Sequence, residues 1–224
     1  HQGSLVGQLA RLRGCHVIGL CGSEEKARAL TDQLGFHGAV NYKASPAQLR
    51  ESIRAALPVG RTSVDVFWDS VGGELSHLIV SELVAAGGQV VLCGAISGYD
   101  SETEYPPPLP ADVAQHVAEH DIRRKRYLVL QHKRHFAEGL AELCRLVASG
   151  RLQAPETRWY GLGAAPTAFC EMMGGANVGK AVVECAPLPP RAARLNALRA
   201  WLPASLRGAA CSRWVHPHDF EGLL

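Results

Sequence analysis

The 224-residue chain has the composition of an ordinary folded domain, with 47% hydrophobic and 20% charged residues. Its formal net charge of +2 is too small to indicate a nucleic-acid or membrane-surface partner. No apolar run reaches the ~18 residues that a membrane-spanning helix needs, and no secretory signal opens the chain, so we expect a cytoplasmic protein. The cysteines form no C-x-x-C pair, so we expect reduced, structural thiols and no structural zinc.

The first part of the chain, up to residue 57, predicts helices on both sides of one buried strand. In chain order the expected elements are a helix over residues 4–12, a strand over 16–21 and helices over 24–34 and 46–57. Ser23 and Ser45 are natural N-caps for the second and third helices, because a serine hydroxyl accepts a hydrogen bond from the first helical turn. Pro46 suits the first helical position, and Gly35 suits the position just beyond a helix.

The middle of the chain continues this alternation of short apolar runs with segments of helical spacing. The expected elements are strands over residues 64–68, 89–93 and 127–130 and helices over 75–86 and 135–148. Residues 105–110 (YPPPLP) predict a stiff, extended surface loop. Apolar strands that alternate with helices of this length are typical of βαβ units buried on both faces. The predicted fold class is therefore α/β, with a doubly wound, mostly parallel sheet.

The sequence after Gly150 predicts a smaller folded segment and then a tail. The expected elements are a strand over residues 157–159, a helix over 165–173 and a strand over 180–185. From Pro187 onward the chain is rich in Arg, Ala and Pro and has no strand pattern. We therefore expect residues 187–224 to form an appendage outside the core.

The start of the first helix is a candidate phosphate site. Gly3 at this point would let backbone N–H groups approach a pyrophosphate, whose charge the helix dipole favours. Gly7, four residues further on, would let the helix pack tightly on a sheet. A complete G-x-G-x-x-G is not present, so this pattern alone is more typical of helix packing than of a nucleotide site.

The turn after the first expected strand is more informative. In NAD-binding folds this turn carries an acidic residue that binds the ribose 2′-hydroxyl. Here Gly22 leaves room, Ser23 offers a hydroxyl and Lys26 can neutralise a 2′-phosphate, a combination that favours NADP over NAD. Glu24 and Glu25 oppose a phosphate, although acids in a first helical turn also complement the helix dipole. A plain solvated lysine is the alternative interpretation of Lys26.

Two further glycine-containing turns follow expected strands, over residues 69–73 (DSVGG) and 94–97 (GAIS). In open α/β sheets the ligand lies at the carboxyl ends of the strands, so such turns are what a crevice for an extended cofactor requires. Each turn by itself is explained equally well as a tight connection. The recurrence of the turns carries the prediction.

Several runs of the sequence together carry a family resemblance. They are VGQLARLRGCHVIGLCGSEEKARAL, LGFHGAVNYK, VDVFWDSVGG, VVLCGAISGY, YPPPLP, RYLVLQ and MMGGANVGK. In order and spacing, from Gly3 to Ala186, the chain resembles the prostaglandin reductases, zinc-free medium-chain dehydrogenases/reductases that act on 15-oxo-prostaglandins and related enones. The resemblance implies a Rossmann-type nucleotide domain, NADPH as the cofactor and a small-molecule enone as the substrate.

The resemblance also implies roles for individual positions. Gly3 would belong to the pyrophosphate loop, while Lys26 and Tyr42 would hold the 2′-phosphate of the cofactor. The positions implied along the nicotinamide and the substrate are Cys93, Gly94, Ala95, Ile96, Ser97, Tyr99, Tyr127, Leu128, Val129 and Asn177. Ser70 stands where the family usually has Asn in FDNVGG. The serine hydroxyl would still donate a hydrogen bond, but its shorter reach would hold the cofactor less tightly.

The implied reaction is the reduction of a conjugated double bond, as in 13-reduction of 15-oxo-prostaglandins. NADPH delivers a hydride to the β-carbon of the enone, and the charge that develops on the carbonyl oxygen must be stabilised by a hydrogen-bond donor. A proton must also reach the α-carbon. Tyr99 is the candidate catalytic donor, beside a ribose hydroxyl of the cofactor. A packing role is the alternative for a tyrosine that borders a loop.

The resemblance further implies parts of the fold that this sequence lacks: the first strand of the Rossmann sheet and an N-terminal GroES-like substrate domain. We predict an incomplete NADP-binding domain over residues 1–156, a segment over 157–186 that normally returns to the substrate domain, and the unmatched tail over 187–224. An open slot in the sheet would cost ~1–3 kcal/mol for each buried, unpaired backbone group, so we expect the chain by itself to be poorly folded and inactive. Both a monomer and a homodimer fit the sequence.

Two other functions compete with the reductase. His116, Glu119 and His120 match H-x-x-E-H, a zinc-peptidase pattern, but no third ligand is evident, and His216 and His218 in the tail are no more complete. An inactive or regulatory nucleotide-binding fragment of the same fold is the more serious alternative. Binding of NADPH without consumption of any enone would favour that alternative.

Overall fold

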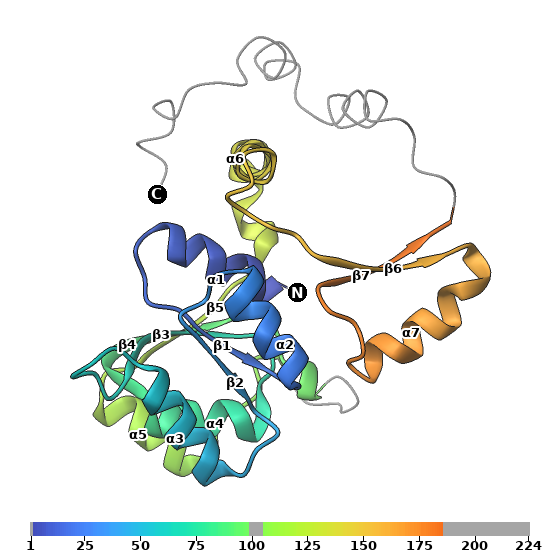
Figure 1. The fold of residues 1–224 in the computed structure, drawn as a ribbon. Coiled ribbons are helices and arrows are strands. Elements are labelled where there is room, and N and C mark those ends of the chain that lie inside the picture. Colours follow the sequence, from blue (N-terminus) through green and yellow to red (C-terminus); the bar gives the residue numbers. More distant parts are fainter. Residues whose placement is uncertain (1, 99–104, 186–224) are drawn as a thin grey trace. The chain divides into compact units, whose positions relative to one another are not determined.

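A computed structural model describes residues 2–98 and 105–185 of the chain (Figure 1). The chain divides into two compact units, His1–Gln131 and His132–Leu224, and each is described by itself. Tyr99 and the tail over residues 187–224 lie outside the described residues. Within the described ranges, no helix combines the length and the apolar composition needed to cross a membrane.

The strands of the first unit form two parallel ladders in the described part of the chain. β1 (Ile18–Cys21) pairs with β2 (Gly38–Asn41), and β3 (Val64–Asp69) pairs with β4 (Val84–Leu92), which also pairs with β5 (Arg123–Arg126). The helices of this unit are α1 (Gln2–Leu12), α2 (Glu24–Arg28), α3 (Pro46–Ala56), α4 (Gly73–Glu82) and α5 (Ala111–Glu119). In Figure 1, α3, α4 and α5 lie together on one side of the strands, and α1 and α2 lie on the other. This arrangement confirms the predicted α/β fold with parallel strands.

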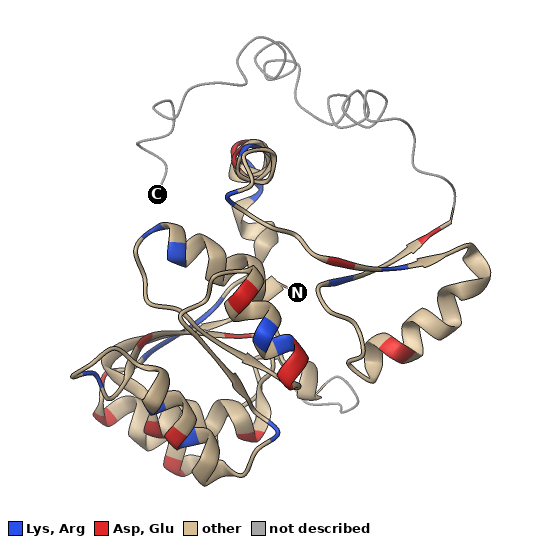
Figure 2. Cartoon of the chain, viewed as in Figure 1, with Lys and Arg blue, Asp and Glu red and all other residues tan. Residues whose placement is uncertain are grey.

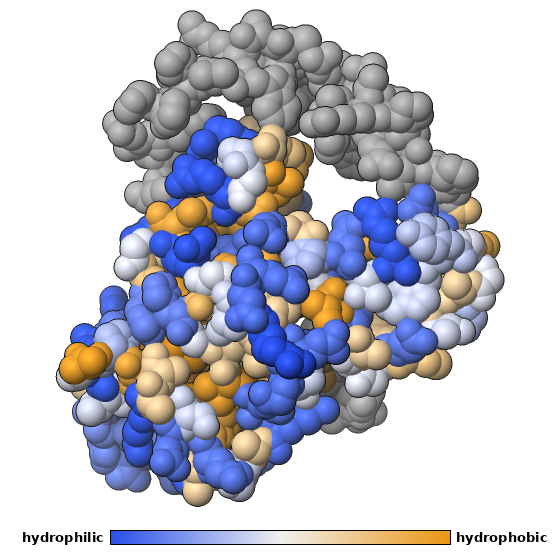
Figure 3. Space-filling model, in the orientation of Figure 1, coloured by the Kyte–Doolittle hydropathy of each residue, from blue (hydrophilic) through white to orange (hydrophobic). Residues whose placement is uncertain are grey.

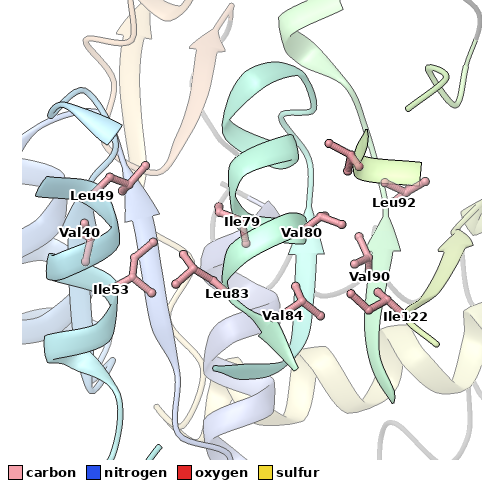
Figure 4. Packing of buried hydrophobic residues seen from close by; sticks show 11 residues of the cluster. Val40, Leu49, Ile53, Ile79, Val80, Leu83, Val84, Val90, Leu92 and Ile122 are labelled. Carbon is pink, nitrogen blue, oxygen red and sulfur yellow. The ribbon is translucent and has the colours of Figure 1, made fainter. Parts of the chain in front are cut away.

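The two ladders share one hydrophobic core although no strand pairing joins β1 to β3 among the described residues. Val80 and Val90 are fully buried at its centre, and Figure 4 shows side chains from both ladders and from the helices packed together. The buried members are Val40, Leu49, Ile53, Ile79, Val80, Leu83, Val84, Val90, Leu92, Val113 and Ile122. Each such side chain contributes ~1.5–3 kcal/mol by leaving water, so helix packing holds the two ladders together without a bridging strand. The chain therefore covers only part of the Rossmann-like fold.

The helix starts agree with the predicted caps. The Ser23 hydroxyl accepts the backbone N–H of Lys26 at 3.3 Å and begins α2. Ser45 begins α3 with a full capping box, in which the Gln48 backbone N–H and side chain both bond back to Ser45. The helix expected over residues 24–34 is confirmed in position, but it continues after Arg28 as a π-helix over Ala29–Gln33.

The strand predicted over residues 127–130 is wrong. The strand lies four residues earlier, at β5, and the chain after it turns into a 3-10 segment over Val129–His135. β5 has the sequence RRKR, and it pairs only with β4 in the described part of the chain, so its charged side chains reach solvent at the sheet edge. A search for apolar runs therefore could not find it.

Two other boundaries also differ from the prediction. The helix expected over residues 75–86 ends at Glu82, and β4 already begins at Val84. The short strand β2 was not predicted, because its four residues (GAVN) contain only one buried side chain, Val40. In both places the tertiary pairing with a parallel neighbour determines the structure more than the local pattern does.

The ring of Phe36 fills the space that two glycines leave between α1 and β1. A Cβ at Gly7 would overlap the Phe36 ring, and a Cβ at Gly19 would lie 2.9 Å from Phe36 Cδ2. Phe36 itself is 7% exposed. Gly7 therefore allows close packing, as predicted, and the aromatic ring is what packs there.

The second unit contains α6 (Phe136–Ala148), β6 (Glu156–Tyr160), α7 (Ala165–Met173) and β7 (Lys180–Glu184). β6 and β7 pair in parallel, from Glu156 opposite Lys180 to Tyr160 opposite Glu184. The helix and the strands predicted after Gly150 are confirmed, with α7 at the predicted bounds.

His16 and His37 lie just before the two strands of the first ladder, β1 and β2, and contact each other. His37 Nδ1 accepts the backbone N–H of Val17 at 3.0 Å, and its ring stacks on His16 with 4.4 Å between centroids. Burial lowers the pKa of His37 below its ordinary value of 6.5, and the nearby His16 and Arg11 lower it further. The fold therefore favours neutral His37, because a proton on Nδ1 would replace the accepted hydrogen bond.

We expect the stability that His37 provides to be present above pH 6.5 and lost as the pH falls below it. In that range the unfolded chain binds the proton more tightly than the folded chain does, so acid favours unfolding until the lowered pKa is reached. The loss is small because the ring is exposed. The melting temperature of His37→Asn, which keeps an acceptor without titrating, should fall less than that of the wild type between pH 7.5 and 5.5. Equal falls would contradict the assignment.

Candidate nucleotide-binding site

The carboxyl ends of the parallel strands and the start of α1 meet at one edge of the first unit. Gln2, the first residue of α1, donates from Nε2 to the Cys93 sulfur at the end of β4 over 3.0 Å. The start of α1, with Gly3, therefore lies beside the turn that begins at Cys93. Apart from the backbone of α1 itself, no atom lies within 4 Å of the place where a Gly3 Cβ would stand, so the space beside Gly3 is open.

The ends of β1 and β2 form a corner lined by Gly22, Ser23, Lys26, Tyr42 and Lys43. The Tyr42 hydroxyl lies 3.0 Å, and Lys43 Cε 3.3 Å, from the position that a Gly22 Cβ would occupy. A larger residue at position 22 would displace both side chains. Because Gly22 has no side chain, the Tyr42 and Lys43 side chains can lie over the end of β1.

The acidic residues at this corner are partly engaged. Asn41 donates from Nδ2 to the Glu24 carboxylate at 3.2 Å, and its Oδ1 accepts the backbone N–H of Lys43 at 3.1 Å. Figure 2 shows acidic and basic segments adjoining one another along α2, and hydrophilic residues cover this helix in the space-filling view of Figure 3. The corner is accessible, polar and mixed in charge.

The turn after β3 is organised by one buried carboxylate. Asp69 is 1% exposed, and its Oδ1 accepts the backbone N–H groups of Val71 and Gly72, both at 2.9 Å. Its Oδ2 accepts the Ser76 hydroxyl at 2.6 Å, which ties the turn to the first part of α4. Three hydrogen bonds therefore offset the cost of burying this acid.

The two glycine turns are joined to each other. Ser97 donates both its backbone N–H, at 3.0 Å, and its hydroxyl, at 2.7 Å, to the Val71 carbonyl oxygen. A Cβ at Gly73 would lie 2.9 Å from the Ser97 hydroxyl, so the close approach requires a residue without a side chain. The turns over residues 69–73 and 94–97 thus form one rigid element, as a crevice at strand ends requires.

Two polar atoms near the end of β3 are buried without a hydrogen-bond partner among the described residues: the Ser70 hydroxyl and Trp68 Nε1. Trp68 lies in β3, and Ser70 is the first residue after that strand ends at Asp69. Trp68 packs against Tyr127, with 5.7 Å between ring centroids. Unsatisfied groups of this kind fit a ligand site with polar partners, and they cost free energy in its absence.

Arg124, in β5, is hydrogen-bonded to the proline-rich segment. Its Nη2 donates to the Pro107 carbonyl at 3.0 Å, and Tyr105 donates its hydroxyl to the Leu92 carbonyl at 3.2 Å. Burial lowers the pKa of the Arg124 guanidinium, while the negative charge of Asp69 opposes this shift. The segment predicted as a surface loop is therefore anchored to the end of the sheet.

The structure brings most of the predicted site residues of the first unit to this edge. Gly3, Ser23, Lys26, Tyr42, Ser70 and the residues from Cys93 to Ser97 lie in the elements just described, and Tyr127, Leu128 and Val129 follow β5. Asn177 lies in the second unit, where its Nδ2 donates to the Gly179 carbonyl at 2.7 Å. Tyr99, the predicted catalytic donor, falls outside the described residues. Sequence reasoning missed Lys43, Trp68 and Gln2 as neighbours of the site.

The cysteines and the H-x-x-E-H segment show no sign of a metal centre in the described ranges. The described cysteines are all free thiols, and burial raises the pKa of the Cys21 thiol. The rings of His116 and His120 stack with 4.0 Å between centroids, and His120 Nδ1 lies 3.0 Å from the His116 carbonyl oxygen. Glu119 instead accepts a hydrogen bond from Gln115 at 2.7 Å. His216 and His218 lie outside the described residues.

Known proteins with similar sequences include a prostaglandin reductase and an NADP-dependent oxidoreductase. The chain is 35% identical over 219 residues to prostaglandin reductase 1 of Oryctolagus cuniculus, a match that covers 97% of this chain and 54% of the relative. It is 33% identical over 186 residues to the putative NADP-dependent oxidoreductase YfmJ of Bacillus subtilis, covering 81% of this chain and 52% of the relative. The chain thus spans about half the length of these relatives.

A solved structure with the same fold is CurA of Vibrio vulnificus in complex with NADPH. It superposes with a TM-score of 0.71 at 29% identity, over 83% of this chain and 54% of CurA. The superposition includes most of the described residues, so the incomplete Rossmann-like arrangement described above corresponds to part of a larger known fold.

Residues 34–183 match the family described as zinc-binding dehydrogenase. Within residues 2–98 and 105–185, no group of three or more His, Cys, Asp or Glu side chains could hold a metal ion. The metal in the family's description therefore has no ligand set in this part of the chain. The match covers more than half of the sequence and agrees with the fold: the chain belongs to the zinc-binding dehydrogenase family of the medium-chain dehydrogenase/reductase superfamily.

Proposed function

We propose that the protein containing this chain is an NADPH-dependent reductase of conjugated double bonds, and that the first unit binds the cofactor. The relatives support this proposal, since one is named an NADP-dependent oxidoreductase, another a prostaglandin reductase, and CurA was solved with NADPH. The observation that carries it is the corner at the ends of β1 and β2, where the Tyr42 hydroxyl lies 3.0 Å from the place of a Gly22 Cβ and Ser23 caps the helical turn that contains Lys26. Such a corner fits a phosphorylated ribose better than a ribose diol.

The other elements of the edge suit the remaining parts of the cofactor. The backbone N–H groups at the start of α1, around Gly3, would face the pyrophosphate. The rigid turn from Cys93 to Ser97 would lie along the nicotinamide, and Ser70 would donate to the cofactor from the end of β3. When bound, NADPH supplies a hydride to the β-carbon of the enone. Tyr127, Leu128, Val129 and Asn177 would complete the contacts with the nicotinamide end and the substrate.

A hydrogen-bond donor must then stabilise the charge on the enone oxygen. We assign this role to Tyr99, which lies two residues after the turn over residues 94–97. Within the substrate class, we propose 15-oxo-prostaglandins reduced at the 13-position, as in prostaglandin reductase 2. The type 1 relative described above supports the wider reductase group, and the choice of type 2 rests on the sequence runs. A cytoplasmic location and the domain division at residues 156 and 186 remain part of the same proposal.

The alternative function is that of an inactive or regulatory nucleotide-binding fragment of the same fold. The two functions differ in one observable. A fragment binds NADPH but leaves a 15-keto-prostaglandin unchanged, whereas a reductase consumes both in equal amounts.

Reversing the charge at Lys26 should weaken NADPH binding by roughly ten- to thirtyfold and leave NADH binding nearly unchanged. The variant Lys26→Glu places a carboxylate where the 2′-phosphate carries charge, at an effective cost of ~1–2 kcal/mol near a protein surface. Titration calorimetry with both cofactors measures the effect. Arg28→Glu makes the same charge change two residues further along α2, on another face of the helix, and should have little effect. Equal affinity of the wild type for NADH and NADPH would overturn the proposal.

A further inference from the structure

The side chain of the exposed Lys43 extends over the backbone at Gly22, just after the end of the neighbouring strand β1. Its Cε lies 3.3 Å from the place of a Gly22 Cβ, and the ammonium is one bond further on. Gly22 is also where the Tyr42 hydroxyl is seated, at 3.0 Å. Lys43 and Tyr42 therefore share the space above the turn that leads from β1 to Ser23.

The backbone of Lys43 is fixed at this point. The ladder pairs Cys21 with Asn41, so the residues after β2 lie opposite the residues after β1. The Lys43 backbone N–H donates to Asn41 Oδ1 at 3.1 Å, and Asn41 donates onward to Glu24 at 3.2 Å. These hydrogen bonds fix the position of the Lys43 backbone, and they do not involve its side-chain ammonium. Within the described ranges, no carboxylate lies within 4.0 Å of that ammonium, so it is available to a ligand.

The charge balance of the corner depends on this one residue. Glu24 and Glu25 contribute two negative charges, and Lys26 and Lys43 contribute two positive charges, so the corner is neutral with Lys43 and has a net charge of −1 without it. A phosphate monoester carries about −1.5 to −2 charges at pH 7, so a corner of net negative charge would repel it. Lys26 offsets one of the two negative charges, and Lys43 offsets the other.

We propose that Lys43 is a specificity-determining residue of the nucleotide site, whose ammonium binds the 2′-phosphate of the adenosine ribose from the β2 side while Lys26 binds it from the α2 side. The proposal rests on the proposed cofactor. It explains why position 22 is a glycine and why two acids in the first turn of α2 are tolerated beside a phosphate. Tyr42, seated beside Lys43, orients the same phosphate by a hydrogen bond.

Calorimetric titration of the full 224-residue chain with NADPH and NADH, at low and at high salt, tests this role. Lys43→Met should weaken NADPH binding about fivefold and Lys43→Glu roughly thirtyfold, in the range of exposed charge pairs, while NADH binding stays unchanged. The Met variant should also lose part of the salt dependence of NADPH binding, and Lys43→Arg should restore both. Arg13→Met removes a positive charge beyond α1, before β1 begins and so at the opposite end of that strand, and should bind NADPH like the wild type.

The outcomes separate this inference from the proposed function. If the wild type prefers NADPH and Lys43→Met retains that preference undiminished, the role of Lys43 is refuted and the cofactor assignment stands. If the wild type does not distinguish the two cofactors, the cofactor assignment fails and the inference fails with it. Melting curves of each variant by circular dichroism show whether an affinity change reflects unfolding, and an exposed Lys43 predicts unchanged curves.

Discussion

Replacing Asp69 with alanine should lower the free energy of unfolding by about 3–5 kcal/mol, a large part of the total stability of a domain this size. The carboxylate accepts the N–H groups of Val71 and Gly72 and the hydroxyl of Ser76, and alanine leaves these donors without their partner in a buried turn. The joined turns over residues 69–73 and 94–97 should loosen together, because Ser97 depends on the Val71 carbonyl. Urea unfolding followed by circular dichroism measures the change.

Graded variants show which hydrogen bonds matter. Asp69→Asn keeps one acceptor oxygen and should cost less than the alanine variant, while Ser76→Ala removes a single bond and should cost about 1 kcal/mol. NADPH affinity should fall in the same order, because the turns lose their fixed geometry before the chain unfolds. A stability of Asp69→Ala close to that of the wild type would mean that the turn does not depend on this acid.

Gly179→Ala should disrupt the second unit by more than about 4 kcal/mol, well above the cost of an ordinary glycine replacement. Gly179 has a φ of +78°, and an added Cβ would overlap the Pro155 carbonyl oxygen. That oxygen accepts the Lys180 N–H at 2.9 Å at the start of the β6–β7 ladder, so backbone rather than a flexible side chain would have to move. The Gly179 carbonyl also accepts the Asn177 side chain, which would lose its position.

Gly150→Ala is the matched control for Gly179→Ala. Gly150 has a similar φ of +72°, but nothing lies within 4 Å of the place of its Cβ. The control should therefore show only the cost of the backbone conformation, roughly 1 kcal/mol. Amide hydrogen exchange along β6 and β7 measures both variants, and equal protection in the two would show that the close contact with Pro155 is unimportant.

Local signals in the sequence predicted the elements that depend on local chemistry. Ser23 and Ser45 begin their helices as expected, and α7 has the predicted bounds, because caps and helical periodicity act within a few residues. β5 could not be found in this way, since an edge strand needs no apolar pattern and RRKR has none. β2 is too short to carry a pattern of its own.

The site shows the same division between local and non-local signals. Glycines after strands indicated the edge of the sheet where Gly22 and the turns over residues 69–73 and 94–97 lie, because this rule follows from parallel topology. Lys43 was missed because it lies beside Gly22 only in the folded structure, through the pairing of β1 with β2. These two strands are about 20 residues apart in the chain. Its place directly after Tyr42 was the only available signal.

The packing of Phe36 against Gly7 and Gly19 limits how this part of the protein can change during evolution. A side chain at either glycine needs the volume that the aromatic ring occupies, so an alanine at position 7 becomes acceptable only after the ring has been replaced by something smaller. Such replacements must occur in a definite order, with a less well packed intermediate between them. Divergent relatives should therefore exchange the residues at these positions jointly, and introducing either change alone into this chain should be more damaging than introducing both.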